Sequence, residues 1–423
     1  MKIFAPLRHR GFRILWTGMA VSLLGDGVTL VAIAWQVYQL SNLPTALGTA
    51  MMAMSMPQVL LLLFGGAVSD RFERRWVMLA ADLVRCAALI LLGALSVTGA
   101  LELWHLTVIV AFYGAGSAFF VPAFDGLVPE LVPEEDLPQA NSVDHFVRPL
   151  AGRLIGPALG GALIGLCGVG WAFIFDAATF IVSIACLVAL GPVRLKPRTD
   201  EPGPRCSVWA EIREGSAYVQ SHVWLWGTFV AATISYFLFL GPTEVLMPHI
   251  VKNDLGGTAG DLGMVFAIGG LGSVLASLVM AQRGTPARNM TFIYVAWTLS
   301  TLSIAGYGLV DATWQAMAVC FLFNAFESAG LIVWMTTKQI LVPPRLMGRV
   351  SSIKFIAIAL MPLSYASAGI VASMMGERAT LIGAGTLGAV ATLAFLFLPK
   401  MRAPEISMSA AAIGGLASQS APR

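Results

Sequence analysis

The chain has 423 residues, of which 57% are hydrophobic and only 12% are charged, whereas charged residues make up about a quarter of soluble domains. This composition, with a mean hydropathy of +0.79, excludes an ordinary soluble enzyme and a disordered chain, and a net charge of +3 is too small to attract a nucleic acid. A membrane-spanning helix needs about 20 apolar residues, so a dozen spans use roughly 240 residues and leave little for a catalytic domain. The sequence predicts an all-α polytopic membrane protein.

The first apolar run, which ends near residue 40, follows four basic residues, Lys2, Arg8, Arg10 and Arg13. It is too long for a signal-peptide core and further apolar runs follow it, so it is predicted to be the first membrane span. Apolar runs separated by polar or Gly/Pro residues predict spans at 12–40, 45–68, 76–98, 104–122, 143–167 and 169–190. Six more spans are predicted at 223–250, 257–281, 291–310, 313–336, 353–375 and 380–398.

Basic residues are distributed very unevenly over the loops that this pattern creates. If the chain starts in the cytoplasm, the 26 Lys and Arg residues all fall in cytoplasmic segments or span ends, except Arg85 within a span and Lys252 and Arg378 outside. Cytoplasmic loops carry such an excess of positive charge. The sequence therefore predicts twelve spans with both termini on the cytoplasmic side of a bacterial inner membrane.

A polar, proline-containing segment at 191–222 divides the chain in two, and residues 208–220 within it are expected to form an amphipathic interfacial helix. The segments LVPEEDLPQANSV (131–143) and LVPPRLMGRVSSI (341–353) form a weak repeat at matching loops of the two halves. We therefore expect an N-terminal six-helix bundle at 1–190, the linker at 191–222 and a C-terminal six-helix bundle at 223–399. Residues 400–423 are expected to be a disordered cytoplasmic tail. Paired bundles with a site at their interface are typical of transporters.

The loop after the second span reads GGAVSDRFERR (65–75) and resembles the signature G-x-x-x-D-R-x-G-R-R of the major facilitator superfamily. The matching residues are Gly66, Asp70, Arg71, Arg74 and Arg75, and Glu73 stands where the signature has glycine. The resemblance implies the twelve-helix major facilitator fold and a loop that stabilises one state of an alternating-access cycle. The two glycines at 65 and 66 are expected to allow close approach of the second and eleventh spans or their neighbours. The alternative is that these charges only set the topology.

A second motif, GRLIGPALGG, lies in the fifth span and supplies Gly152, Gly156, Pro157, Gly160 and Gly161. It resembles the element G-x-x-x-G-P-x-x-G-G that is associated with exporters of this superfamily, with Val143 at an upstream position where glycine is usual. The alternative is close helix packing of the kind that small residues support in many membrane proteins. The arginine of the fourth span that many proton-coupled drug exporters share is Val110 here.

Several further segments occur together along nearly the whole chain: LLGDG (23–27), ADLVRC (81–86), VPELVPEEDLPQANS (128–142), FDAATF (175–180) and MGRVSS (347–352). This combination resembles the branch that contains enterobactin exporters and macrolide-efflux proteins. A more distant similarity extends to lysophospholipid transporters. The resemblance implies export, with an amphiphilic drug, a siderophore or a lysolipid as the class of cargo.

Ionisable residues within the spans are the candidate proton and substrate sites, because a charge at the centre of a span costs about 2.5–3.5 kcal/mol and therefore faces a partner or a cavity. They are Asp26, Asp82, Arg85, Asp176, Glu244 and Glu327, with Asp125 near the inner end of the fourth span.

Asp26 and Glu327 have no neighbour in sequence to neutralise them, so they are the first candidates for proton or cargo handling. Asp26 lies between Gly25 and Gly27, where we expect the backbone to loosen. Asp82 and Arg85 lie three residues apart on one helix face and are expected to pair.

The favoured function is secondary-active export, with proton antiport of an amphiphilic small molecule such as a macrolide; a siderophore or lysophospholipid exporter is the alternative. The sequence contains no Walker A motif, so direct use of ATP is not expected. It also contains no Cys or His residues at the spacing of metal ligands. A membrane-embedded enzyme would need clustered His, Asp or Ser residues, and a receptor would not need the loop charges. We expect no cofactor, no enzymatic activity, a monomer, and only the cargo, protons and membrane lipid as partners.

Overall fold

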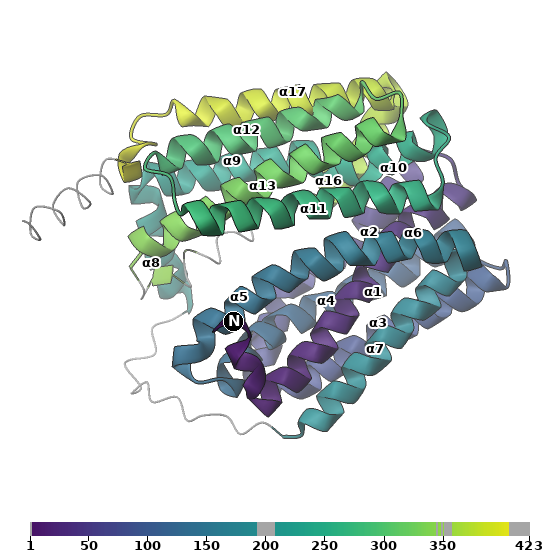
Figure 1. The fold of residues 1–423 in the computed structure, drawn as a ribbon, viewed down its shortest axis with the longest axis horizontal. Helices are drawn as coiled ribbons and strands as arrows, with labels where there is room; N and C mark the ends of the chain where they lie inside the picture. The colour runs from purple at the N-terminus through teal and green to yellow at the C-terminus, as the bar shows by residue number, and fades with distance from the viewer. Residues whose placement is uncertain (1, 193–207, 344–345, 348–349, 351–357, 406–423) are drawn as a thin grey trace, which may run out of the picture.

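The structure is a computed structural model that describes residues 2–192, 208–343, 346–347, 350 and 358–405. Long helices running side by side dominate these residues (Figure 1). The first half comprises α1 (Arg10–Leu40), α2 (Pro44–Arg71), α3 (Arg74–Val97), α4 (Leu103–Leu131), α5 (Leu137–Val147), α6 (Gly156–Cys167) and α7 (Val169–Leu190). Of the linker, residues 193–207 lie outside the described residues, and α8 (Val208–Ser221) covers the segment expected to form an interfacial helix.

The second half comprises α9 (Val223–Gly241), α10 (Met247–His249), α11 (Ala259–Arg283), α12 (Asn289–Tyr307), α13 (Thr313–Leu341), α16 (Met361–Met375) and α17 (Glu377–Leu396). Two spans contain π-helical turns, namely η3 (Arg148–Ile155) between α5 and α6, and η4 (Pro242–Leu246) and η5 (Ile250–Asp254) on either side of α10. Proline lacks a backbone N–H, and π-helical turns often mark functional positions in membrane helices. The fifth and seventh spans are therefore irregular in the same way.

By length and composition, ten of the described helical segments can cross a membrane. The two other spans are α12, which carries several Ser and Thr residues, and α16, whose expected first residues fall in the undescribed segment 351–357. The predicted end of the fourth span at residue 122 is wrong, because α4 continues through Pro122 to Leu131. Neighbouring helices tolerate a proline in a membrane helix by satisfying the backbone groups that it frees.

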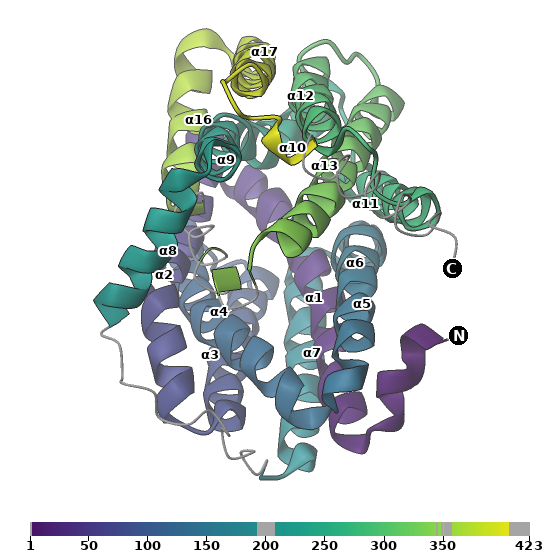
Figure 2. The ribbon, with the colours of Figure 1, turned by 90° about the vertical axis from the view of Figure 1, so that its left-hand side faces the viewer.

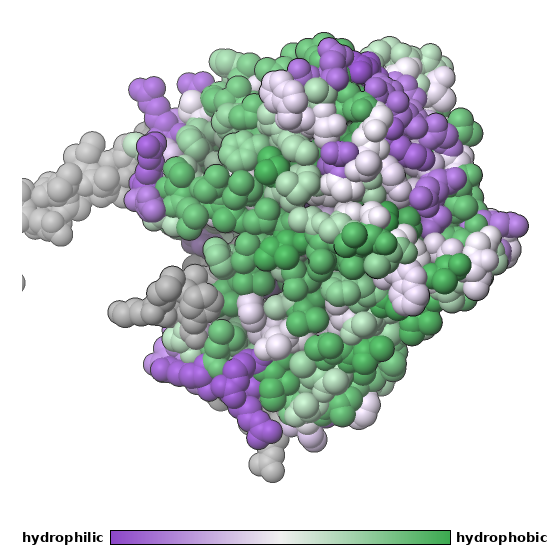
Figure 3. Space-filling model, turned by 45° about the vertical axis from the view of Figure 1, so that its right-hand side comes forward, coloured by the Kyte–Doolittle hydropathy of each residue, from purple (hydrophilic) through white to green (hydrophobic). Residues whose placement is uncertain are grey.

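On the face that Figure 3 shows, apolar residues form a broad belt across the bundle, and hydrophilic residues gather toward its two ends. The belt includes bulky side chains such as Phe112, Leu387 and Val390, each more than half exposed. Contiguous apolar surface of this extent is expected only where lipid covers it. The chain is a multi-pass membrane protein.

The two halves lie side by side, with α1–α7 on one side and α9–α17 on the other (Figure 2). The principal contacts between the halves are α2 with α16, and α6 and η3 with α11. Residues 400–405, which we expected in the disordered tail, turn back onto the bundle, where the Thr291 N–H donates to Glu405 Oε1 at 2.5 Å. Residues 406–423 lie outside the described residues. The all-α polytopic fold predicted from the sequence is confirmed.

Candidate functional site

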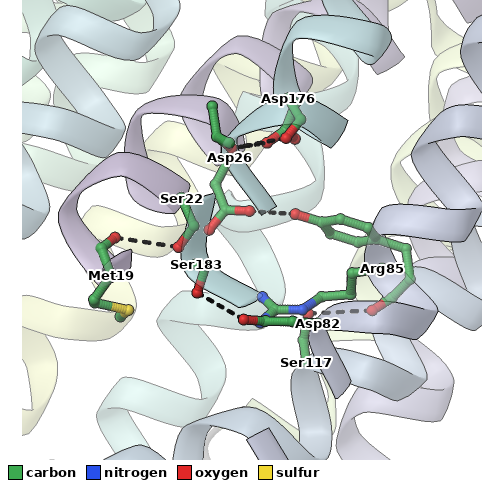
Figure 4. A network of polar contacts seen from close by, with 10 residues as sticks. Met19, Ser22, Asp26, Asp82, Arg85, Ser117, Asp176 and Ser183 are labelled. Carbon is green, nitrogen blue, oxygen red and sulfur yellow. Dashed lines mark hydrogen bonds and ion pairs between the residues drawn. The ribbon is translucent and has the colours of Figure 1, made fainter. Parts of the chain in front are cut away.

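Three helices of the first half bring four of the predicted site residues into one cluster (Figure 4). Asp26 comes from α1, Asp82 and Arg85 from α3, and Asp176 from α7. Asp82 and Asp176 are fully buried, whereas Asp26 is half-buried. The cluster therefore has one member that solvent can reach and two carboxylates sealed behind it.

The Asp82–Arg85 pair predicted from the three-residue spacing is present as an ion pair. Ser183 of α7 donates to Asp82 Oδ2 at 2.7 Å, so the pair also ties α3 to α7. The Arg85 guanidinium lies over the rings of Phe120 and Phe180, 4.4 and 4.5 Å from their centroids. An arginine held between two aromatic faces and a carboxylate is fixed in one orientation.

The other two carboxylates accept hydrogen bonds from neutral hydroxyl groups. Thr29 donates to Asp176 Oδ2 at 2.5 Å and Thr179 donates to Asp176 Oδ1 at 2.9 Å, and the Tyr113 hydroxyl donates to Asp26. Tyr113, on α4, escaped the sequence analysis because a tyrosine in an apolar run carries no charge signal.

The expectation that Gly25 and Gly27 loosen the backbone around Asp26 is wrong, since α1 is continuous through these positions. The glycines instead allow close packing. A Cβ at Gly25 would lie 1.9 Å from Asp176 Oδ1, and one at Gly27 would lie 2.7 Å from the Gly152 carbonyl oxygen. Only a residue without a side chain lets α1 approach α7 and η3 closely enough to place Asp26 in the cluster.

The cluster holds three carboxylates and one guanidinium. The next cation, Arg148, is already paired, because its Nε donates to Asp144 Oδ2 at 2.6 Å. A buried charge without a counter-charge is costly, so a proton is the natural counter-charge for the carboxylates that Arg85 does not balance. This arrangement can exchange a proton at the half-buried Asp26.

Glu244 and Glu327 lie in the second half, apart from this cluster. The Tyr365 hydroxyl donates to Glu244 Oε2 at 2.5 Å. Glu327, on α13, lies one turn from Asn324, whose Oδ1 accepts from Arg153 Nη1 at 3.2 Å. Among the described residues, no contact joins Glu327 to Asp26, so the structure does not bring the two leading candidates together.

Arg153 is a candidate site residue that the sequence analysis missed. It belongs to η3 in the first half, yet its side chain reaches α13 of the second half, and its positive charge lies close enough to act on Glu244 and Glu327. We counted it among the charges at the cytoplasmic ends of spans. Its position inside the predicted fifth span, next to Gly152, was the available signal.

The exporter-type motif packs on both sides of the fifth span. Gly156 and Gly160 face α1, where a Cβ would lie 2.8 Å from Gly27 Cα and 2.9 Å from Val28 Cα, respectively. Gly161 faces the second half instead, where a Cβ would lie 2.7 Å from the Ala259 carbonyl oxygen. A Cβ at Gly152 would meet only ordinary van der Waals contact. The motif thus joins α1, α6 and α11 in one tight stack.

A second close seam joins α2 to α16, where a Cβ at Gly48 would lie 2.6 Å from the Tyr365 carbonyl oxygen and one at Gly369 would lie 2.7 Å from Thr45 Cα. Near it, the Tyr38 hydroxyl donates to the Val245 carbonyl oxygen at 2.7 Å. Both seams lie toward the end of the molecule that carries the α1–α2 turn. That end is closed by backbone-to-backbone packing.

The signature loop at 65–75 makes its described contacts within the first half. Arg74 forms an ion pair with Glu130 of α4 and donates to the Gly126 carbonyl oxygen at 2.9 Å, and its Nη2 lies 3.8 Å from Asp70 Oδ1. Asp70 is largely exposed, Arg71 is exposed, and Arg75 is buried.

Of the two glycines expected to allow close approach of helices, Gly66 does not do so, because a Cβ there would meet no atom within 4 Å. The tight contact is at Gly65, where a Cβ would lie 2.3 Å from the Ala118 carbonyl oxygen. Glu73 adopts a φ of −58°, a value open to any residue, so the glycine of the signature is not needed there.

Asp125 lines a small pocket of about 210 Å³ between α1, α4 and α5, together with Phe12, Trp16 and Asp144. It lies at the end of the first half that carries the amino terminus, apart from the Asp26 cluster. Asp125 therefore does not join the other predicted site residues.

Comparison with known proteins identifies the family. The profile of a family described as transmembrane secretion effector matches residues 1–415. One relative is an MFS-type transporter of Bacillus subtilis, YfiS, which is 24% identical over 90% of this chain and 91% of that protein. Macrolide efflux protein A of Streptococcus pyogenes is 22% identical over 89% of this chain and 93% of that protein. The enterobactin exporter EntS of Citrobacter koseri is 24% identical over 82% of this chain and 81% of that protein.

The fold resembles that of a POT family transporter solved in complex with a thioalcohol-conjugated peptide. The TM-score is 0.71 at 14% sequence identity, over 93% of this chain and 96% of the other. The sequence resemblance to the enterobactin-exporter and macrolide-efflux branch is confirmed. Because the family profile covers almost the whole chain, this protein belongs to the transmembrane secretion effector family of the major facilitator superfamily.

Proposed function

We propose that this protein is a secondary-active exporter of the bacterial inner membrane that exchanges protons for an amphiphilic small molecule such as a macrolide. The observation that carries the proposal is the cluster in which a half-buried Asp26 lies in front of two fully buried carboxylates and a single guanidinium. Such a cluster binds a proton readily when Asp26 faces an acidic compartment and releases it when Asp26 faces a neutral one.

The seams between the halves support alternating access. With both termini in the cytoplasm, as the basic residues predict, the closed end with its α2–α16 and α6–α11 packing faces outward. We propose that residues 1–190 and 223–399 move as two units joined by the linker at 191–222. Glycine seams favour two discrete packed states over gradual deformation, which is what such a cycle needs.

We further propose that the loop at 65–75 acts as a latch in this cycle. In the described conformation, Asp70 is largely exposed and its described ion-pair contact is with Arg74 on its own loop, so it is available for another partner when the halves rearrange. Asp70→Asn should therefore slow transport without altering the amount of folded protein.

The class of cargo rests on the relatives and on one charged side chain. Relatives named for macrolide efflux and for enterobactin export are similar over most of the chain. Arg153 is exposed at the contact between the halves, with the neutral Asn324 as its hydrogen-bond partner, and this favours a cargo with an anionic or strongly polar group. A siderophore of the enterobactin type is therefore the second candidate cargo.

The test is transport into proteoliposomes with an imposed pH gradient, with a macrolide, a catecholate siderophore and a lysophospholipid as parallel cargoes. We expect the wild-type protein to concentrate one cargo only when the gradient is present. Asp26→Asn should abolish uphill transport and retain downhill exchange, because the amide keeps the shape but cannot titrate. Asp311→Asn, at an exposed carboxylate outside the spans, is the matched control and should transport normally.

Three outcomes have distinct meanings. Uphill transport by Asp26→Asn would exclude Asp26 as the coupling group, and Glu327→Gln would then be tested in the same assay. Transport that is indifferent to the pH gradient would overturn proton antiport. Arg153→Gln that weakens siderophore transport but not macrolide transport would favour the second candidate.

A further inference from the structure

An apolar groove of about 630 Å³ runs along the outer face of the second half, between α11, α12 and α13. Leu275 and Val279 of α11, Phe292 and Val295 of α12, and Phe321 of α13 line it. This face belongs to the apolar belt, so the groove opens to the lipid and not to water.

The lining residues of the groove extend along α11 from Gly272 to Met280 and reach the turn between α11 and α12. At Gly272 α11 touches α13, since a Cβ there would lie 2.5 Å from the Phe321 carbonyl oxygen. Eight helical residues from Gly272 to Met280 rise about 12 Å. That length lies within one leaflet of a hydrocarbon core about 30 Å thick, so the groove can hold the part of one acyl chain that is nearest the headgroup.

Two arginines lie at the end of the groove next to the turn between α11 and α12. Arg288 lines the groove directly, and Arg283 is the last residue of α11, on the same helix face as Ala276 and Met280. Both side chains are exposed, and no carboxylate among the described residues lies within ion-pair distance of either. One carboxylate lies at this end, that of Glu405, which accepts a hydrogen bond from the N–H of the lining residue Thr291. The two guanidinium groups therefore leave an excess of positive charge that complements a phosphate.

We propose that this groove binds a single anionic phospholipid, with one acyl chain along α11 and α12 and the phosphate held by Arg283 and Arg288. An apolar lining suits an alkyl chain, and it offers no partners for the polar backbone of a peptide. The phosphate gains charge-assisted hydrogen bonds that a zwitterionic headgroup would share with its own cation. The site is separate from the Asp26 cluster and does not depend on the identity of the cargo.

The test uses purified full-length protein, delipidated in detergent, and three probes: phosphatidylglycerol, phosphatidylcholine with the same acyl chains, and free glycerol phosphate. Binding is measured by native mass spectrometry. We expect phosphatidylglycerol to be retained preferentially and free glycerol phosphate not to compete with it, because the acyl chain contributes to binding. Each arginine near a headgroup is worth about fivefold in affinity, so R283Q/R288Q should weaken phosphatidylglycerol binding by about 25-fold.

Two further variants make the result specific. Arg13→Gln removes an exposed arginine from α1 in the first half, which does not line the groove, and should leave binding unchanged. Ala276→Phe fills the groove and keeps both arginines, and should reduce binding of both lipids. Equal retention of the two lipids, displacement by glycerol phosphate, or an unaltered preference in R283Q/R288Q would each overturn the proposal.

Discussion

At the scale of single residues, the arrangement around Arg85 explains why one cation can be placed so deep in the first half. Its guanidinium has Asp82 as an ion-pair partner and two aromatic rings as neighbours, and the remaining carboxylates lie within the same cluster. Removing a negative charge from this group relieves repulsion, whereas removing the positive charge leaves only negative charges. Substitutions on the two sides of the pair should therefore differ in effect.

We predict that Arg85→Met destabilises the protein by about 3–5 kcal/mol, because it leaves buried carboxylates without their cation. Asp82→Asn should cost much less, and the double variant Arg85→Met/Asp82→Asn should recover part of the loss. Thermal unfolding in detergent measures all three. An Arg85→Met protein as stable as the wild type would show that protons already neutralise the carboxylates without help from Arg85.

A pH-dependent contact lies outside the spans, at Asp136 in the turn between α4 and α5. A hydrogen bond with His9, opposed in part by burial and reinforced by Arg8, lowers the pKa of the Asp136 carboxyl below its ordinary value. A lowered folded-state pKa means that the contact contributes stability above the ordinary carboxyl pKa and loses it as pH falls through the lower value.

The protection of the amides of residues 2–9 against hydrogen exchange, measured relative to the intrinsic rate at each pH, should therefore stay constant from neutral pH down to about pH 4 and fall only below that. Asp136→Ala should show low protection at every pH. Protection in the wild-type protein that falls between pH 7 and pH 5 would mean that another group, with a higher pKa, holds the segment.

At the scale of helices, glycines decide which faces touch. Helix α6 supplies a matched pair, because a Cβ at Gly161 of the exporter-type motif would collide with α11 whereas a Cβ at Gly165, beyond the motif, would meet nothing within 4 Å. The two glycines lie one turn apart on the same helix. Comparing the same substitution at Gly161 and Gly165 therefore separates its effect on the contact between the halves from its effect on helix propensity.

We predict that Gly161→Val lowers the equilibrium constant for the closed state by about five- to 150-fold, the range that corresponds to about 1–3 kcal/mol of overpacking. The transport rate should fall with it. Gly165→Val should behave as the wild type. Spin labels at the exposed residues Leu43 and Met374, on either side of the α2–α16 seam, report the separation of the halves. An unchanged distance distribution in Gly161→Val would show that this seam does not control opening.

At the scale of the whole molecule, orientation determines which compartment each site meets. The two halves pack closely at the end of the molecule that carries the α1–α2 turn. Most basic residues lie at the opposite ends of the spans. A cytoplasmic location of both termini would make the described state open toward the cytoplasm, ready to accept cargo from inside.

Cysteine labelling in intact cells tests this orientation. In a background where Cys167 and the linker residue Cys206 are replaced by Ser, a membrane-impermeant maleimide should label Asp311→Cys and should not label Ala287→Cys. Both positions are exposed, so the difference reports sidedness. The reverse pattern would place the termini outside and invert the assignment of the closed end.

What the sequence determined by itself depends on local chemistry. Long apolar runs predict membrane helices because each run must satisfy its own backbone hydrogen bonds in lipid, and the Asp82–Arg85 pair follows from spacing within one helix. The signature loop and the exporter-type motif similarly revealed the family, because they are short contiguous patterns. These predictions needed no knowledge of how one helix packs on another.

Only the tertiary structure decided what depends on contacts between distant segments. Asp26 and Asp176 lie 150 residues apart and meet because Gly25 lets α1 approach α7, while Glu327 lies elsewhere. From the sequence, Arg153 is interpreted as one of the basic residues that set the membrane topology. In the structure its side chain donates a hydrogen bond to Asn324 in the other half of the molecule. The sequence contains each of these side chains, but the direction in which a helix presents them is set by packing against its neighbours, which hydropathy and motif spacing do not encode.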